Sequence, residues 1–397
     1  MIRGLLLDLD DTLLANDTSR FLPAYFQRLS LSFPGQASPD DVLTQLLRAT
    51  KRMMENRDPL RTLKEVFDAA FYPALGLDAE SARPGVAAFY REVFPELRSL
   101  TAPLPGAADL VTAARDLGLP IVIATNPMMP EAAVQQRLEW AGLPPSRPSF
   151  ELLTSYESFH FAKPDPAYVA EILGRMGWRP TEAAMIGNDP ADDLQPASLL
   201  GMPVFHIRGR PEGALPGGDH AAAFAWIRRG PPLPYPFTGS DPRAIEARLR
   251  GQAAALDALT RGLTSQDWRH HPDGGGRAPV EIVCHLRDVE AEVTLPRLEL
   301  IRHQPNPFLP APDTGLWVLE RGYAGQSGPE AVQAVQRLRH QLLLELDALA
   351  PEDWQRPARH ALLGPTTLAE VLSTAAEHEI VHLASLRAAL DGSAAGE

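Results

Sequence analysis

Two aspartates near the start of the chain, Asp8 and Asp10, have the residue type and the spacing for covalent hydrolysis. They follow the apolar run 2–7, and an apolar run closed by alternate carboxylates predicts a buried strand that leads into an active site. In an open α/β sheet, ligands bind beyond the carboxyl ends of the strands. One carboxylate can attack while the other transfers protons. We therefore expect the catalytic centre at this strand end.

Three further polar segments follow predicted strands or begin predicted helices. They are Thr125-Asn126 after the strand 121–124, Lys163-Pro164-Asp165, and the acidic loop 187–193 after the strand 184–186. Together with Asp8-Leu9-Asp10-Asp11-Thr12, these segments in this order resemble the haloacid dehalogenase superfamily over about residues 1–228.

The resemblance implies a role for each of these residues. Asp8 would be the nucleophile that forms an aspartyl-phosphate, and Asp10 would protonate the leaving oxygen and later deprotonate water. Thr125 and Lys163 would hold the phosphoryl oxygens, with Lys163 as a point charge that also restrains Asp8. The residues expected to contact the substrate are Leu9 and Asn126.

Asp10 also separates two reaction classes within this superfamily. Relatives that cleave carbon–halogen bonds lack an aspartate two residues after the nucleophile, because a halide leaving group needs no proton. Phosphonatases lack it as well. Its presence at position 10 favours hydrolysis of a small phosphorylated metabolite, a phosphomonoester.

The resemblance implies Mg²⁺ as the cofactor, since this ion prefers oxygen ligands in octahedral geometry. Asp8, the backbone carbonyl of Asp10 and an acid of the loop 187–193 would supply ligands. Many relatives have Gly-Asp where this chain has Gly187-Asn188, so the carboxylate is displaced to Asp189.

We expect Asp189 to be the Mg²⁺ ligand from this loop, with the amide oxygen of Asn188 as the alternative. Asp193 would support the site through hydrogen bonds to Lys163 or to metal-bound water.

The C-terminal part of the chain changes to long amphipathic patterns with no clear strand. The predicted helices span 242–263, 279–302, 329–349 and 367–390. Four helices of this length suggest an antiparallel four-helix bundle.

Two histidines of the last predicted helix, His378 and His382, share one helix face because they lie four residues apart. The segment 378–382 matches the HExxH pattern of zinc proteases, but no histidine follows it to complete such a site. His285 on the second helix is a better third ligand. Three imidazoles with an open position suit Zn²⁺ or Ni²⁺.

This half of the chain resembles the DinB-like metal-binding bundles over about residues 240–392. The matching features are Asp267-Trp268, the segment 279–285 and the closing His-x-x-x-His. Some such bundles resemble thiol-dependent transferases, in which the metal lowers the pKa of a low-molecular-weight thiol. One alternative function is therefore a metal- and thiol-dependent transferase activity in the bundle, beside a weak or regulatory first half. The other is a non-catalytic bundle that senses metal or forms a homodimer.

The domain organisation follows from these patterns. Alternating strands and helices predict an α/β doubly wound parallel sheet, Rossmann-like, over 1–14 and 95–229. Residues 15–94 have only helical patterns and should form an inserted helical cap. The proline-rich segment 230–240 predicts a stiff linker, followed by the bundle over 241–397.

Composition limits the possible partners and the location. The chain has 397 residues and a net charge of -13, which disfavours nucleic acid as a partner. No window approaches the roughly 20 apolar residues that a membrane span needs. Cys284 is the only cysteine, so an intrachain disulfide is excluded, and a reducing cytoplasm is the expected location.

Overall fold

A computed structural model of the chain describes residues 2–33, 38–143, 150–207, 215–232, 240–272 and 275–393. These residues belong to two compact units, Met1–Tyr168 with Pro180–Pro236 and Val169–Arg179 with Phe237–Glu397. Most of the predicted linker 230–240 lies outside the described residues. Within the described ranges, no helix is long and apolar enough to cross a membrane.

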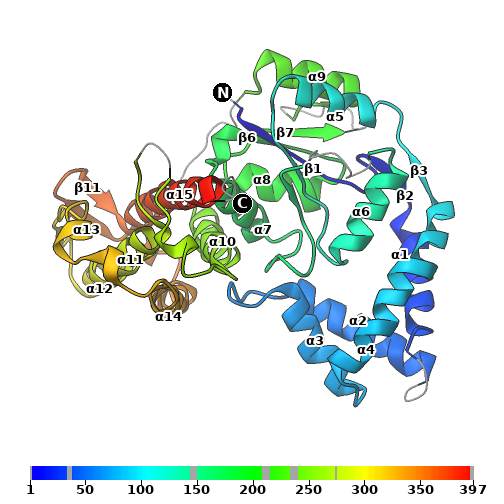
Figure 1. The fold of residues 1–397 in the computed structure, drawn as a ribbon. Coiled ribbons are helices and arrows are strands. Elements are labelled where there is room, and N and C mark those ends of the chain that lie inside the picture. Colours follow the sequence, from blue (N-terminus) through cyan, green and yellow to red (C-terminus); the bar gives the residue numbers. More distant parts are fainter. Residues whose placement is uncertain are drawn as a thin grey trace. The chain divides into compact units, whose positions relative to one another are not determined.

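The first unit is built on a six-stranded sheet (Figure 1). Its strand order is β5 (Leu152–Leu153), β4 (Ile121–Ile123), β1 (Gly4–Leu7), β6 (Ala183–Gly187), β7 (Val204–Ile207) and β8 (Gly217–Gly218). All neighbours pair in parallel, which confirms the predicted doubly wound sheet. The last strand, β8, was not predicted, because two glycines give no strand signal. Every residue of β1 is buried, as the unbroken apolar run requires.

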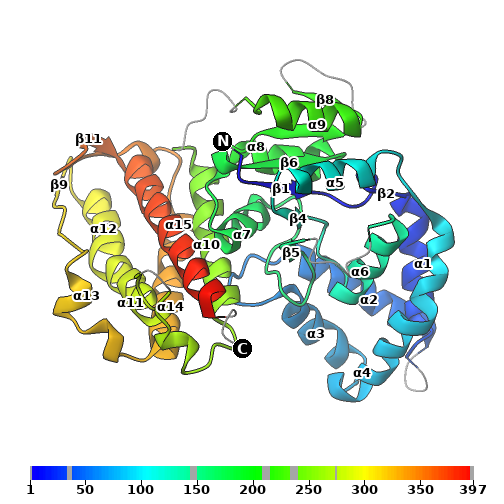
Figure 2. The same ribbon diagram turned by 45° about the horizontal axis from the view of Figure 1, so that its top comes forward.

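Helices follow the strands of this sheet in the order that parallel pairing needs. In this unit they are α5 (Ala107–Asp116), α6 (Glu131–Trp140), α8 (Gln195–Leu199) and α9 (His220–Arg229), while α7 (Pro166–Met176), which follows β5 in the sequence, belongs mostly to the second unit. Helices α5 and α9 lie side by side on one face (Figures 1 and 2). Their buried faces join the strands in one apolar core. The predicted catalytic residues lie in the segments that follow β1, β4 and β5, which lead to β2, α6 and α7 in turn.

The predicted insert contains four helices, α1 (Thr18–Ser30), α2 (Pro39–Met54), α3 (Leu63–Ala74) and α4 (Ala79–Ala88). A π-helical turn, η1 (Phe89–Val93), and a 3-10 helix, η2 (Phe94–Leu100), continue them. The chain leaves and re-enters the sheet region through a ribbon of β2 (Leu14–Asn16) and β3 (Thr101–Pro103), which pair antiparallel. The sequence did not predict this ribbon, because three-residue strands leave no periodic signal.

The second unit contains the predicted four-helix bundle (Figure 2). Its helices are α10 (Pro242–Thr260), α11 (Pro279–Val289) continued by η6 (Glu290–Thr294) and α12 (Leu295–His303), α14 (Gly328–Asp347) and α15 (Leu368–Ser393). Short helical segments connect them: η5 (Asp267–Arg269), α13 (Trp317–Glu320), η7 (Tyr323–Gly325) and η8 (Asp353–Gln355). Trp268 and Trp354 are both buried in the turns that follow α10 and α14.

The expectation that this half of the chain contains no strand was wrong. A three-stranded sheet forms from β9 (Phe308–Leu309), β10 (Pro357–His360) and β11 (Gly364–Thr367), in the order β11-β10-β9. These strands are short, and two of them begin with proline or glycine, residues that are depleted in strands. A pattern of alternating apolar residues therefore could not reveal them.

A buried arginine links three helical segments of the bundle. The Arg339 guanidinium on α14 is 4% exposed and donates to Glu290 Oε1 at 2.7 Å and to Glu379 Oε2 at 2.6 Å. It also donates to the backbone oxygen of Leu249 at 2.8 Å. Both glutamates are buried, so each depends on Arg339 for a compensating charge.

We predict that Arg339→Met lowers the free energy of unfolding by about 3–5 kcal/mol, because two buried carboxylates lose their partner. Urea denaturation followed by circular dichroism measures the change. The matched control is Arg302→Met, whose ion pair with Glu345 is partly exposed and should contribute less than about 1 kcal/mol. Similar losses in the two variants would contradict the role given to Arg339.

Candidate active site and metal centre

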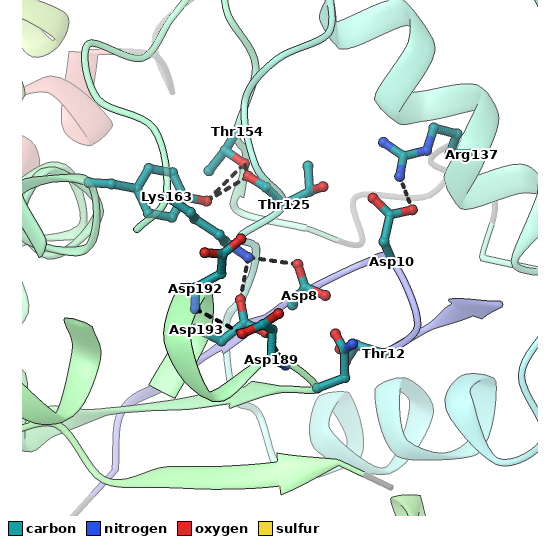
Figure 3. A network of polar contacts seen from close by, with 12 residues as sticks. Asp8, Asp10, Thr12, Thr125, Arg137, Thr154, Lys163, Asp189, Asp192 and Asp193 are labelled. Atoms are coloured by element: carbon teal, nitrogen blue, oxygen red, sulfur yellow. Dashed lines mark hydrogen bonds and ion pairs between the residues drawn. The ribbon is translucent and has the colours of Figure 1, made fainter. Parts of the chain in front are cut away.

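Three neighbouring strands bring the predicted segments to one edge of the sheet. Asp8 follows β1, Thr125 follows β4 and Asn188 follows β6. The hydrogen bonding between β1 and β6 continues into the site, since Asp8 N donates to Ile186 O at 3.0 Å. Because β1 lies between β4 and β6, the side chains from these segments gather around Asp8 (Figure 3).

A tight turn after β1 positions Asp10. The Leu9 carbonyl accepts from the amides of Leu13 at 2.8 Å and Leu14 at 2.9 Å. Asp11 adopts a left-handed conformation with φ of 52°, which aspartate tolerates better than most residues. The side chain of Leu9 is fully buried, so only its backbone can face a substrate.

Lys163 lies between two buried carboxylates. Its Nζ donates to Asp8 Oδ1 at 2.7 Å and to Asp193 Oδ1 at 2.6 Å, and all three side chains are buried. Burial alone would lower the pKa of Lys163, but the charges of Asp193 and Asp8 outweigh it and raise the pKa. Burial, together with the charge of Asp193, raises the pKa of Asp8 to about 7, against the opposing effect of Lys163.

The packing of the turn after β6 explains why a glycine stands at its start. A Cβ on Gly187 would lie 2.2 Å from Asp193 Oδ2, so only glycine lets Asp193 reach Lys163. The same Oδ2 accepts from the backbone N of Asp189 at 3.1 Å. Asp193 thus contacts Lys163 directly, which is the first of the two expected arrangements; the second was a hydrogen bond to metal-bound water.

Asp189, the expected Mg²⁺ ligand of this loop, caps a helical turn. Its side chain is exposed and caps the π-helical turn η4 (Pro190–Leu194), where Oδ1 accepts from Ala191 N at 2.7 Å and Asp192 N at 3.1 Å. An N-cap aspartate satisfies amide groups at a helix start. The structure therefore gives no support to Asp189 as a metal ligand.

Asn188 instead points into the site. One terminal atom of its amide lies 2.8 Å from the Asp10 carbonyl oxygen, 3.3 Å from Asp8 Oδ2 and 3.1 Å from Thr12 Oγ1. An amide nitrogen at this position donates to the first two oxygens. With the amide oxygen in this position, three oxygens lie close together: Asn188 Oδ1, the Asp10 carbonyl oxygen and Asp8 Oδ2. Adjacent oxygen ligands of octahedral Mg²⁺ lie roughly 2.9 Å apart, because each Mg–O bond is about 2.0–2.1 Å long. The residues present therefore fit a Mg²⁺ ion.

The Thr125 hydroxyl is available to an oxyanion. Oγ1 is buried and has no hydrogen-bond partner within the described residues. The backbone oxygen of Thr125 is fixed by the hydroxyls of Thr154 at 2.6 Å and Tyr168 at 2.8 Å. Asn126 lies beside it, and its Oδ1 is also buried without a partner in the part of the chain that the structure describes.

Arg137 was not among the predicted site residues, although it contacts Asp10 directly. Its guanidinium, 3% exposed on α6, forms an ion pair with Asp10 Oδ1. Asn16 Nδ2 donates to the same oxygen at 2.7 Å. Arg137 shares the buried face of α6 with Val134 and Leu138, so helical spacing could have revealed a buried arginine.

The three predicted histidines meet in the second unit. His285 on α11 and His378 on α15 place their Nε2 atoms 3.3 Å apart, and the Nε2 atoms of His378 and His382 are 3.1 Å apart. All three ligand nitrogens lie within 4.8 Å of one another. Nitrogens bound tetrahedrally to Zn²⁺ at about 2.0–2.1 Å lie roughly 3.4 Å apart, so this arrangement fits a single divalent ion.

The electrostatics of this cluster favour neutral rings. Burial, with the charge of His378, lowers the pKa of His285 to about 4 and that of His382 to about 2. Burial also lowers the pKa of His378. Cys284 takes no part in the cluster; it is buried, and its Sγ donates to Gln326 Oε1 at 3.5 Å.

Two family models match the chain. Residues 2–201, half of the chain, match the haloacid dehalogenase-like hydrolases, and residues 248–386 match the DinB superfamily.

Two curated relatives match part of the chain. A phosphoglycolate phosphatase of Thiobacillus denitrificans is 29% identical over 218 residues, which are 53% of this chain and 87% of that protein. A phosphoglycolate phosphatase of Caulobacter vibrioides is 29% identical over 152 residues, 38% of this chain and 60% of that protein.

Solved structures also resemble parts of the chain. A haloacid dehalogenase phosphatase from Thermococcus onnurineus has a TM-score of 0.36 and 20% identity, covering 58% of this chain and 99% of its own. YfiT from Bacillus subtilis, described as a probable metal-dependent hydrolase with an unusual four-helix bundle topology, has a TM-score of 0.34 and 18% identity. That match covers 38% of this chain and 87% of YfiT.

Proposed function

Because this chain belongs to the haloacid dehalogenase-like hydrolases, we propose that its first unit is a Mg²⁺-dependent phosphatase that hydrolyses a small phosphomonoester through an aspartyl-phosphate. The observation that carries the proposal is the group around Asp8. Its carboxylate meets Lys163 on Oδ1, while Asp10 lies two residues further on and the Thr125 hydroxyl has no partner among the described residues.

The chemistry takes place in two steps. The Asp8 carboxylate attacks phosphorus, the bond from phosphorus to the leaving oxygen breaks, and Asp10 gives that oxygen a proton. Asp10 then accepts a proton from water, which attacks phosphorus and releases Asp8. Lys163 and Thr125 bind the phosphoryl oxygens in both steps. Preformed hydrogen-bond donors there stabilise the charge that develops in the transition state.

Arg137 and Asn16 position Asp10 for proton transfer. Both bind Oδ1 of Asp10, which fixes the carboxylate and leaves Oδ2 for proton transfer. A positioned acid of this kind typically accelerates a reaction by about 10²–10⁴-fold.

The metal ligands in this proposal are Asp8, the carbonyl of Asp10 and Asn188, with Asp193 in support through Lys163. Asn188 replaces Asp189 in this set, because Asp189 caps a helical turn. When bound, Mg²⁺ offsets the repulsion between a carboxylate nucleophile and an anionic phosphate.

The first prediction tests the nucleophile. Asp8→Asn should lower the release of phosphate from p-nitrophenyl phosphate by at least about a thousandfold, because the amide cannot form the acyl phosphate. The matched control is the neighbouring Asp11→Asn, in which the asparagine oxygen can still accept from Asn16 N and the left-handed conformation is still tolerated. An active Asp8→Asn variant would refute the mechanism.

The second prediction tests the metal ligand. Asn188→Ala should raise the Mg²⁺ concentration for half-maximal activity by about 10–100-fold or more, because one oxygen ligand is lost. Asp189→Asn should leave it unchanged, since asparagine caps helices as well as aspartate does. Mg²⁺ titrations of phosphatase activity give both values, and the reversed pattern would restore Asp189 as the ligand.

For the second unit we propose a divalent metal centre, Zn²⁺ or Ni²⁺, held by His285, His378 and His382. The convergence of their Nε2 atoms supports it. An ion there keeps an open position and would supply a Lewis acid that lowers the pKa of water or a thiol. This favours a metal- and thiol-dependent transferase over a purely structural bundle as the second candidate activity.

His378→Ala should abolish stoichiometric Zn²⁺ or Ni²⁺ binding by the full chain, measured by elemental analysis after dialysis. The control is His340→Ala, an exposed histidine of α14 that lies outside the cluster. Equal metal content in the two variants would exclude this centre.

A further inference from the structure

The bundle contains a cavity of about 210 Å³ to which the proposed activities assign no ligand. Its apolar walls come from every helix of the bundle, with Leu249 on α10, Val293 on η6, Val335 on α14 and Val371 on α15. A single water needs only about 10–15 Å³ of such space, so the cavity can hold a small organic molecule. The same space is bordered by polar groups in two places.

One polar group consists of Arg297 and His360. Arg297 has no carboxylate partner among the described residues, and its Nε is buried without a hydrogen-bond partner. His360 Nδ1 accepts from the amides of Leu362 at 3.2 Å and Leu363 at 3.3 Å, so the proton of the neutral ring is on Nε2. Arg297 Nη2 donates to the backbone oxygen of Pro310 at 2.5 Å, so the guanidinium is held in place. The Nε–H of Arg297 and the Nε2–H of His360 remain as donors with no acceptor among the described residues.

The second polar group is next to the metal centre. His378 and Glu379 of α15 both line the cavity, and Glu379 Oε1 is buried without a partner in the described part of the chain. Arg339 joins Glu379 to Glu290, which lies seven residues before Arg297 on the same continuous helical stretch. Seven residues at about 1.5 Å each place the Cα atoms of Glu290 and Arg297 roughly 10 Å apart along the helix axis.

We propose that this cavity binds a small organic carboxylate with an apolar chain. Arg297 and His360 hold the carboxylate, since a guanidinium matches the planar geometry of that group. The chain lies along the apolar wall, and its far end reaches His378, where it would be the substrate of the bundle's metal centre. This last step depends on the metal centre proposed above, whereas the carboxylate site does not.

The test uses the full chain loaded with Zn²⁺ and isothermal titration with octanoate. Octanoate should bind, and octanamide, of similar shape but without charge, should bind at least about tenfold more weakly. Arg297→Gln should weaken octanoate binding by at least about tenfold, and His360→Asn should weaken it severalfold. Asparagine can still accept the two backbone amides there, so this variant removes only the distal donor.

The matched control is Arg302→Gln, which removes an arginine of the same helix that does not line the cavity. Its octanoate affinity should equal that of the wild type. Equal affinity in Arg297→Gln, or equal binding of octanoate and octanamide, would overturn the proposal. Zinc content is measured on the same samples. Octanoate binding without zinc refutes only the metal centre, and zinc binding without octanoate refutes only the carboxylate site.

Discussion

The candidate active site depends on one buried cation, the ammonium group of Lys163 between Asp8 and Asp193. Two carboxylates enclosed at this distance from a common partner would repel each other, and each would be costly to bury alone. The positive charge of Lys163 offsets the repulsion between the two carboxylates and the cost of burying them. It also fixes the orientation of Asp8 while Asp193 fixes Lys163. Gly187 is required for the same reason, because a side chain there would occupy the position of Asp193.

The second unit also places a buried cation between two carboxylates. Arg339 on α14 binds Glu290 on η6 and Glu379 on α15, and the three segments come from distant parts of the chain. Glu379 is the neighbour of His378, and Glu290 follows the helix that carries His285. The ion pairs that join these helices therefore also set the spacing of the histidine cluster. In both units, a buried cation shared by two carboxylates joins elements that carry candidate site residues.

Long periodic elements were predictable because burial leaves a clear pattern in the sequence. The run before Asp8 had to be an inner strand, and the four amphipathic patterns had to be helices, so two helices of the bundle carry the three histidines. The role of Lys163 came from the resemblance to the superfamily and not from periodicity. Strands of two to four residues such as β8 and β9 leave no such pattern, and their pairing depends on distant partners.

Within the site, residue type alone favoured Asp189 over Asn188, whereas the geometry of the turn favours Asn188. An aspartate is the more obvious metal ligand, but the turn after β6 turns Asp189 outward to cap η4 and Asn188 inward. Arg137 was missed for a related reason. It comes from a helix outside the four motif segments, and only the fold brings it to Asp10.

The central claim is that Asp8 becomes covalently phosphorylated, and the Asp10→Asn variant tests it most directly. With p-nitrophenyl phosphate, whose leaving group needs little protonation, the first step should still proceed while water attack stalls for lack of a base. Borohydride reduction followed by peptide mass spectrometry then locates the acyl phosphate. The account predicts stoichiometric modification at Asp8. Hydrolysis with no modified Asp8, or modification at another carboxylate, would contradict it.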